Sequence, residues 1–199
     1  MSGRIDRPEF RFGRTVVTVA IGDLLGQEAE GVVFAANCRG VMGSLATPGL
    51  TGLRSLGGSE IEREAMVRAP LDLGSAILTS ATGLEERGAR AVIHAVIHPA
   101  LGERTRAEHV RRVVPAIFMS ASRAQLRSLA LPLLGVESLA SRSDIEPMVE
   151  AMVLELVGVL RRSVPRLDRV TIVCRFEDHV EVATQALTNA RARVWTRNP

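Results

Sequence analysis

The pattern of hydrophobic and polar positions predicts short strands that alternate with helices. Two short strands are predicted at the start of the chain, from Phe10 to Phe12 and from Thr15 to Ile21, the second of which is rich in β-branched residues. Residues 31–36 are apolar without interruption, which is typical of a strand buried on both faces. Four more strands are predicted at 75–80, 91–97, 129–134 and 169–174.

Helices are predicted after the strands, at about 50–67, 105–125, 144–162 and 177–192. Pro115 is expected to kink the second of these helices. Ser143 is the predicted N-cap of the third, with Glu146 following three residues later. Strands that alternate with helices indicate a layered α/β sandwich, and the opening strand pair indicates that the central sheet is mixed.

The composition fits one globular domain. The chain has 199 residues, of which 46% are hydrophobic, so we expect one domain over residues 1–199 with a sizeable core at about residues 15–187. No apolar run approaches the roughly 20 residues that a membrane span requires, and residues 1–14 lack the apolar segment of a signal peptide. We therefore expect a soluble, cytoplasmic protein without membrane contact.

Charge and missing residue types exclude several kinds of chemistry. The formal net charge is +3, yet every basic residue is arginine, because the chain contains no lysine. This excludes a Walker-A lysine and a lysine Schiff base. The arginines are spread along the sequence rather than grouped, so nucleic-acid binding is not indicated.

Cysteine and histidine residues give no strong signal for a metal or a nucleophile. Cys38 and Cys174 are expected to stay reduced in the cytoplasm. His94 and His98 lie on a predicted strand, where four residues separate them by about 13 Å, too far to share one ion. No histidine base can be paired with Cys38 from the sequence. We therefore expect no metal site and no cofactor.

Unusual residues follow three of the predicted strands. Gly22-Asp23 follows the second strand, Asn37 ends the third, and a Pro-Leu-Leu-Gly-Val segment begins at Pro132. Ligands of α/β proteins bind beyond the carboxyl ends of strands, where loops lead into helices. We therefore expect these three strand ends to be neighbours and to converge on one ligand pocket.

The order and spacing of these segments resemble the macrodomain family. That family has Gly-Asp after its second strand, Asn-Ala-Ala-Asn after the third, a glycine-rich loop, and a late strand leading into a second loop. The strands GSAILT at 74–79 and VIHAVIHP at 92–99 also resemble family strands. The resemblance covers about residues 15–185 and implies a three-layer α/β/α sandwich around an ADP-ribose pocket.

The resemblance also implies roles for individual residues. Asp23 matches a buried carboxylate that accepts a hydrogen bond from the adenine amino group. Asn37 matches an asparagine that faces the distal ribose. Main-chain amides of two loops would hold the phosphates, without any need for lysine. The implied ligand-binding residues are Asp23, Leu24, Ala36, Asn37, Gly43, Ser44, Leu45, Ala46, Gly135, Val136, Glu137 and Ser138.

Simpler interpretations exist for two of these residues. Asp23 could be only a helix N-cap, and Asn37 could only stabilise its own turn. Departures from the family pattern also matter: Phe34 replaces the first asparagine, Pro48 follows the glycine loop, and Glu137 would repel a pyrophosphate if it faced the ligand.

Three functions remain open at this point. The first is binding of ADP-ribose or a related nucleotide. This protein could also hydrolyse an ADP-ribosyl ester or ADP-ribose 1″-phosphate weakly. Thr47 and Leu50 are nearest to the position of the family's catalytic aspartate, and neither is a base. Hydrolysis would therefore rely on Asn37, which would orient the distal ribose for attack by water. The second is a degenerate macrodomain that serves as an oligomeric or protein-interaction scaffold. The third is RNA binding, which would require the arginines to cluster on one face.

Overall fold

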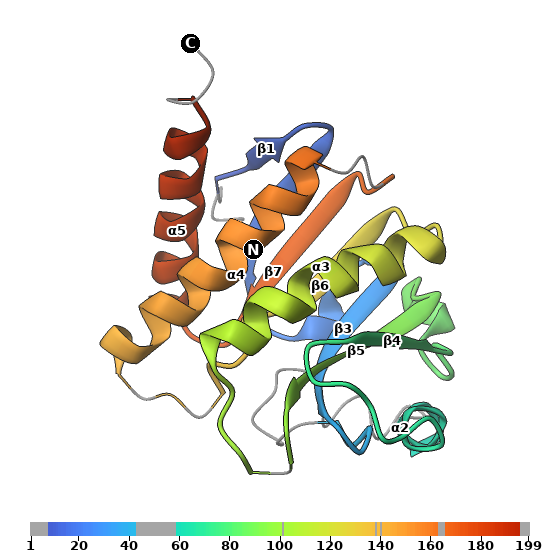
Figure 1. Ribbon diagram of the computed structural model, residues 1–199. Coiled ribbons are helices and arrows are strands. Elements are labelled where there is room, and N and C mark those ends of the chain that lie inside the picture. The colour runs from blue at the N-terminus through green and yellow to red at the C-terminus, as the bar shows by residue number, and fades with distance from the viewer. Residues whose placement is uncertain are drawn as a thin grey trace.

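The computed structural model describes residues 8–42, 59–100, 102–137, 139, 141–162 and 166–195. Its centre is a seven-stranded sheet with the order β1-β2-β7-β6-β3-β5-β4 (Figure 1). The strands are β1 (Phe10–Phe12), β2 (Thr15–Ile21), β3 (Gly31–Asn37), β4 (Ala76–Thr79), β5 (Ala91–His98), β6 (Ser128–Pro132) and β7 (Arg169–Cys174).

The sheet is mixed, as the opening strand pair predicts. β2, β7, β6, β3 and β5 are parallel to one another, whereas β1 and β4 pair antiparallel at the two outer positions. Each predicted strand is present, with bounds that differ from the prediction by two residues or fewer. The carboxyl ends of all five parallel strands therefore meet at one edge of the sheet.

Helices cover the two faces of the sheet unequally. The described helices are α2 (Ser59–Met66), α3 (Ala107–Arg123), α4 (Arg142–Arg162) and α5 (Glu177–Trp195), with short 3-10 turns η1 (Leu24–Gly26) and η3 (Glu85–Arg87). α3, α4 and α5 pack side by side on one face, while α2 and η1 lie on the other (Figure 1). The result is a three-layer α/β/α sandwich; residues 50–58 of the predicted first helix lie outside the described residues.

Alternation along β3 divides its side chains between two hydrophobic cores. Val33 and Ala35 pack in the core beneath α3, α4 and α5, whereas Val32 and Phe34 pack in the core on the α2 side. Phe34 is completely buried there, together with Met42. Phe34 is therefore a core residue rather than a ligand contact.

The predicted N-cap of α4 is wrong by two residues. The helix begins at Arg142, and the hydroxyl of Ser141 accepts a hydrogen bond from the main-chain N–H of Asp144 and donates one to its carboxylate. Ser143 instead shares a hydrogen bond with the Ser141 hydroxyl. Both serines fit a capping pattern in the sequence, and only the first helical residue distinguishes them.

Pro115 lies inside α3, which is one continuous helix from Ala107 to Arg123.

No helix in the described ranges combines the length and the apolar character that crossing a bilayer requires.

Candidate functional site

The carboxyl edge of the sheet brings the three predicted segments to one side of the molecule. Asp23 follows β2, Asn37 ends β3, and Gly135 lies three residues beyond β6. However, the three strands are not all neighbours, because β7 lies between β2 and β6. Adjacent strands are spaced about 4.8 Å apart, so the ends of β2 and β3 are roughly 14 Å apart. A ligand that reaches from Asp23 to Asn37 must be elongated.

Asp23 caps η1 and is exposed, not buried as expected. Its Oδ1 accepts a hydrogen bond from the main-chain N–H of Leu25 at 3.0 Å. The cap leaves the exposed carboxylate with further acceptor capacity, since an ionised carboxylate has about four acceptor positions. Leu24 is fully buried in the α2-side core, so it can offer a ligand only main-chain groups.

Asn37 is buried and organises the turn that follows β3. Its Oδ1 accepts hydrogen bonds from the main-chain N–H groups of Arg39 at 2.9 Å and Val41 at 3.2 Å. This is the Asx interaction that the sequence left open as a simpler interpretation. Because Oδ1 serves the turn, Nδ2 is the group with which Asn37 could donate to a ligand. Ala36, just before it, is completely buried.

Gly135 sits where only glycine fits. Its φ is +80°, and a Cβ at this position would lie 2.9 Å from Cγ2 of Thr105. The Thr105 hydroxyl is itself anchored to the end of β5, because it donates to the Ile97 carbonyl at 2.8 Å and lies 2.8 Å from Nδ1 of His98. The loop after β6 therefore packs tightly against the segment after β5.

Glu137 turns inward from the same loop. The residue is half-buried, yet its Oε1 is buried and has no hydrogen-bond partner. Burial raises the pKa of this carboxyl, opposed by main-chain N–H groups and by the positive charge of nearby His98. The carboxyl is thus biased toward its neutral form, in which it repels phosphate less than a carboxylate would.

Sequence reasoning missed Phe176, two residues beyond β7. Its ring is 51% exposed, which is unusual for phenylalanine. The Arg175 guanidinium lies 5.2 Å from the ring centre, and His179 meets the ring edge-on at 5.3 Å. Phe176 also lines a small cavity of about 60 Å³ together with Val136 and Glu137. One signal was available: aromatic residues make up only 3% of the chain, and this one follows a predicted strand directly.

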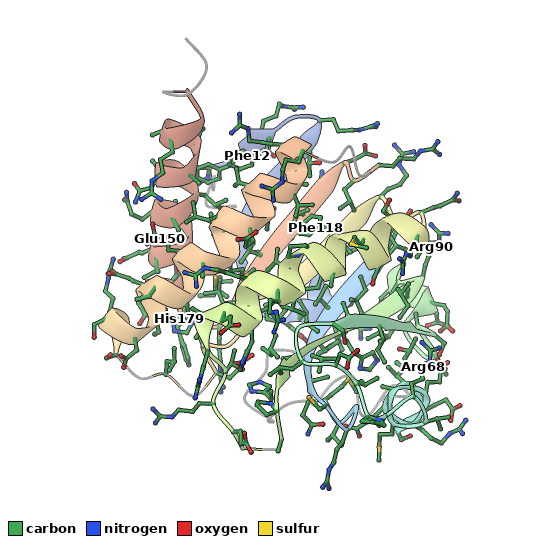
Figure 2. The ribbon with its side chains drawn as sticks, viewed as in Figure 1. Phe12, Arg68, Arg90, Phe118, Glu150 and His179 are labelled. Carbon is green, nitrogen blue, oxygen red and sulfur yellow. The ribbon has the colours of Figure 1, made fainter. Side chains whose placement is uncertain are left out.

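β2 and β7 are hydrogen-bonded neighbours at this edge. Ile21 is paired with Cys174, and the N–H of Gly22 donates to the Cys174 carbonyl at 2.9 Å. Asp23 and Phe176 each lie two residues beyond this pair. An exposed carboxylate and an exposed aromatic ring thus leave adjacent strand ends. The ring contacts His179 at the start of α5, and Figure 2 labels this histidine.

Cys38 and the histidines do not form a catalytic set. Burial raises the pKa of the half-buried Cys38 thiol, and the negative charges of Asp72 and Glu103 add to the rise, so the thiol stays protonated. His94 is completely buried and bonds through Nε2 to the Thr79 hydroxyl at 2.9 Å. Among the residues with described placement, no group of three or more potential metal ligands occurs.

Five residues of the predicted site, Gly43, Ser44, Leu45, Ala46 and Ser138, lie outside the described residues. The described residues of the predicted site are therefore Asp23, Leu24, Ala36, Asn37, Gly135, Val136 and Glu137.

Comparison with known proteins decides the family. The model of the family described as Macro domain matches residues 33–142. The chain belongs to the macro domain family. An uncharacterized protein of Aeropyrum pernix is 35% identical over 83% of this chain and 82% of its own length, and one of Aquifex aeolicus is 32% identical over 86% and 97%.

Solved macrodomain structures share the fold at low sequence identity. The Oceanobacillus iheyensis macrodomain with ADP has a TM-score of 0.74 and 16% identity, covering 94% of this chain and 97% of its own. The Trypanosoma brucei macrodomain in complex with ADP-ribose has a TM-score of 0.69 and 21% identity, covering 86% and 68%. The resemblance inferred from short motifs in the sequence is therefore confirmed at the level of family and fold.

Proposed function

We propose that this macro domain binds ADP-ribose or a related nucleotide across the carboxyl edge of its sheet. Family membership supports the proposal, as does the fold that it shares with macrodomains solved with ADP-ribose and with ADP. The arrangement of side chains at this edge supports it independently, as follows.

The observation that carries the proposal is the pairing of Asp23 with Phe176 at adjacent strand ends. A purine base has a flat π-face and an exocyclic amino donor. The exposed ring of Phe176 offers a stacking surface, and such stacking contributes about 1–3 kcal/mol per base. The exposed carboxylate of Asp23 can accept the amino hydrogen bond while it still caps η1.

Phosphate binding would depend on main-chain donors. Turns that expose successive N–H groups bind anions without cationic side chains, and the left-handed Gly135 supplies such a turn after β6. Glu137 is compatible with this role when its buried carboxyl is neutral. At the far end, Nδ2 of Asn37 would donate to a ribose hydroxyl.

The second part of the proposal is weak hydrolysis. Weak turnover of an ADP-ribosyl ester or of ADP-ribose 1″-phosphate would proceed by attack of a bound water, with Asn37 orienting the ribose. Product analysis with both substrates would test this, and Asn37→Ala should abolish any turnover observed. Turnover that survives this substitution would remove Asn37 from the mechanism.

Calorimetric titration tests the binding proposal. The wild-type protein should bind ADP-ribose, and Asp23→Ala should weaken binding by roughly 1.5–3 kcal/mol, the typical size for a hydrogen bond to a charged group. Asp23→Asn retains a cap acceptor and separates the role of the cap from that of the charge. Glu28→Ala, which removes another exposed carboxylate from the same loop, should leave affinity unchanged.

A ligand-side control uses the hypoxanthine analogue of ADP-ribose, which lacks the amino donor. Wild-type protein should discriminate against this analogue, and Asp23→Ala should not. Absence of binding at millimolar ADP-ribose would contradict the proposed function.

The scaffold alternative receives no support from the surface. It predicts an extensive exposed apolar face, but the large apolar side chains that are exposed among the described residues lie on different elements: Ile21, Met66, Val67, Met119, Leu154 and Phe176.

A further inference from the structure

Arginines that are dispersed in the sequence gather at the amino-terminal edge of the sheet, opposite the proposed nucleotide cleft. Each parallel strand begins at this edge, and the helices α3 and α4, which lead into β6 and β7, end there. Figure 2 shows the labelled Arg90 beside the end of α3, on the far side of the sheet from His179. We name this surface the arginine edge; its exposed residues are Arg14, Arg90, Arg123, Arg127, Arg161, Arg162, Arg166 and Arg169.

Strand pairing and main-chain hydrogen bonds hold these residues together. Arg169 begins β7 and is paired with Val16 of β2 and Ser128 of β6. The main-chain N–H groups of Asp168 and Arg169 both donate to the Arg127 carbonyl. The carboxyl end of α4 reaches the same place, since a Cβ on Gly13 would lie 3.5 Å from the Leu160 carbonyl.

Among the described residues, two carboxylates form ion pairs with the arginines of this surface. Asp168 bridges Arg14 at 2.9 Å and Arg127 through its Nε at 2.7 Å. Glu30 pairs with Arg90 at 3.2 Å. In the part of the chain that the structure describes, the other five arginines form no ion pair, and they are Arg123, Arg161, Arg162, Arg166 and Arg169.

The charge is therefore strongly asymmetric. Eight arginines less the two paired carboxylates leave +6 at this edge. Glu28 and Glu86 line a pocket of about 540 Å³ beside Ser128, between the starts of β6 and β5, and including them lowers the sum to +4. The whole chain carries a formal net charge of only +3, so the remainder of the molecule is net negative.

The chemistry of the edge restricts its partner. None of the large apolar side chains exposed in the described residues lies on it, so it offers neither an anchor for a bilayer nor a ring for stacking on unpaired bases. What it offers is a closely spaced series of guanidinium groups, with Arg14, Arg169 and Arg127 at the starts of three consecutive strands about 4.8 Å apart. Duplex nucleic acid carries a similarly dense charge, about one per 1.7 Å of helix axis.

We propose that the arginine edge binds the phosphate backbone of duplex nucleic acid without reading its sequence. The nucleotide cleft lies on the opposite edge and stays accessible in such a complex. The proposal does not depend on the function proposed for that cleft, because no residue is shared between the two surfaces.

Fluorescence anisotropy with labelled duplexes of unrelated sequence tests the proposal. Binding should be independent of sequence, and the logarithm of the association constant should fall linearly with the logarithm of salt concentration. Five phosphate contacts would give a slope of about −4.5. The double variant Arg166→Glu/Arg169→Glu should lower the steepness by roughly 2 and weaken binding more than tenfold at fixed salt.

A matched control changes net charge by the same amount elsewhere. Arg111→Glu/Arg112→Glu lies on the exposed surface of α3 and should bind duplex within threefold of wild type. Arg161→Ala/Arg162→Ala is a second edge variant with a smaller charge change, and circular dichroism confirms that each variant is folded. All variants should retain the wild-type affinity for ADP-ribose, if that ligand binds.

Three results would overturn the proposal. The first is equal weakening by the control and edge variants, which would indicate a net-charge effect. The second is binding that does not respond to salt. The third is preference for anionic phosphatidylserine vesicles or for polyglutamate over the duplex at the same salt, which would assign the edge to a membrane or to an acidic protein.

Discussion

His94 should make this fold sensitive to mild acid. The imidazole lies on the central part of β5, is completely buried, and is hydrogen-bonded through Nε2 to Thr79. Its Nδ1 has no hydrogen-bond partner. Burial lowers the pKa of His94 to about 4; the negative charge of Glu64 opposes this shift and the positive charge of Arg68 reinforces it. A proton on this ring would place an unsolvated charge inside the sheet.

The sign and size of the effect follow from the two protonation states. The unfolded chain binds a proton at His94 near pH 6.5, whereas the folded chain binds it only near pH 4. Between these values the unfolded state holds more protons, so stability falls as pH falls. The full contribution is present above pH 6.5 and is lost by pH 4, and a shift of this size corresponds to about 3 kcal/mol.

Urea denaturation at a series of pH values measures this loss. The His94→Gln variant keeps a side chain that can bond to Thr79 but cannot titrate. The free energy of unfolding of wild type should fall about 3 kcal/mol more than that of the variant between pH 7 and pH 4. Other groups titrate in both proteins and cancel in the difference.

Parallel pH profiles for the two proteins would refute the reasoning. So would an NMR titration in which the His94 ring in the folded protein gains its proton near pH 6.5, because the ring would then be solvated.

Two further predictions concern the loop after β6. The Glu137 carboxylate repels phosphate more than the neutral carboxyl does, so ADP-ribose affinity should fall as pH rises through the raised pKa of Glu137. Calorimetry should show no such fall for the Glu137→Gln variant or for adenosine as ligand. Wild-type affinity for ADP-ribose that does not change with pH would contradict this prediction. Gly135→Ala should destabilise the fold by about 1–2 kcal/mol through the left-handed backbone conformation alone. The loss should be larger than this, because the new methyl group would also meet Thr105. Thermal denaturation checks this, and Thr105→Ser, which removes the clashing methyl, should recover part of the loss.

Much of the fold could be predicted from local sequence. Apolar runs marked the buried strands, and β-branched residues marked β2, whose predicted bounds match the structure to the residue. Helix ends were less secure, because Ser141 and Ser143 are both good N-caps and only packing decides which one begins α4. The site was predicted less completely, since the family resemblance identified its segments but not the burial or the hydrogen bonding of each side chain.

The sequence by itself determined the elements, the family, and which loops leave the carboxyl ends of strands, because these depend on periodicity and on residues close together in the chain. Strand order is different, since it depends on long-range pairing. It placed β7 between β2 and β6 and thereby brought Phe176 beside Asp23. Only the tertiary structure committed Oδ1 of Asn37 to its own turn and buried the carboxyl of Glu137.

The arginines show the same division most clearly. Along the chain they are spread rather than grouped in one block and indicate no charged surface. Parallel strands all begin at one edge, and the helices between them must return to that edge, so residues dozens of positions apart become neighbours there. Composition fixed how much positive charge the protein carries, and topology decided that much of it gathers opposite the proposed nucleotide cleft.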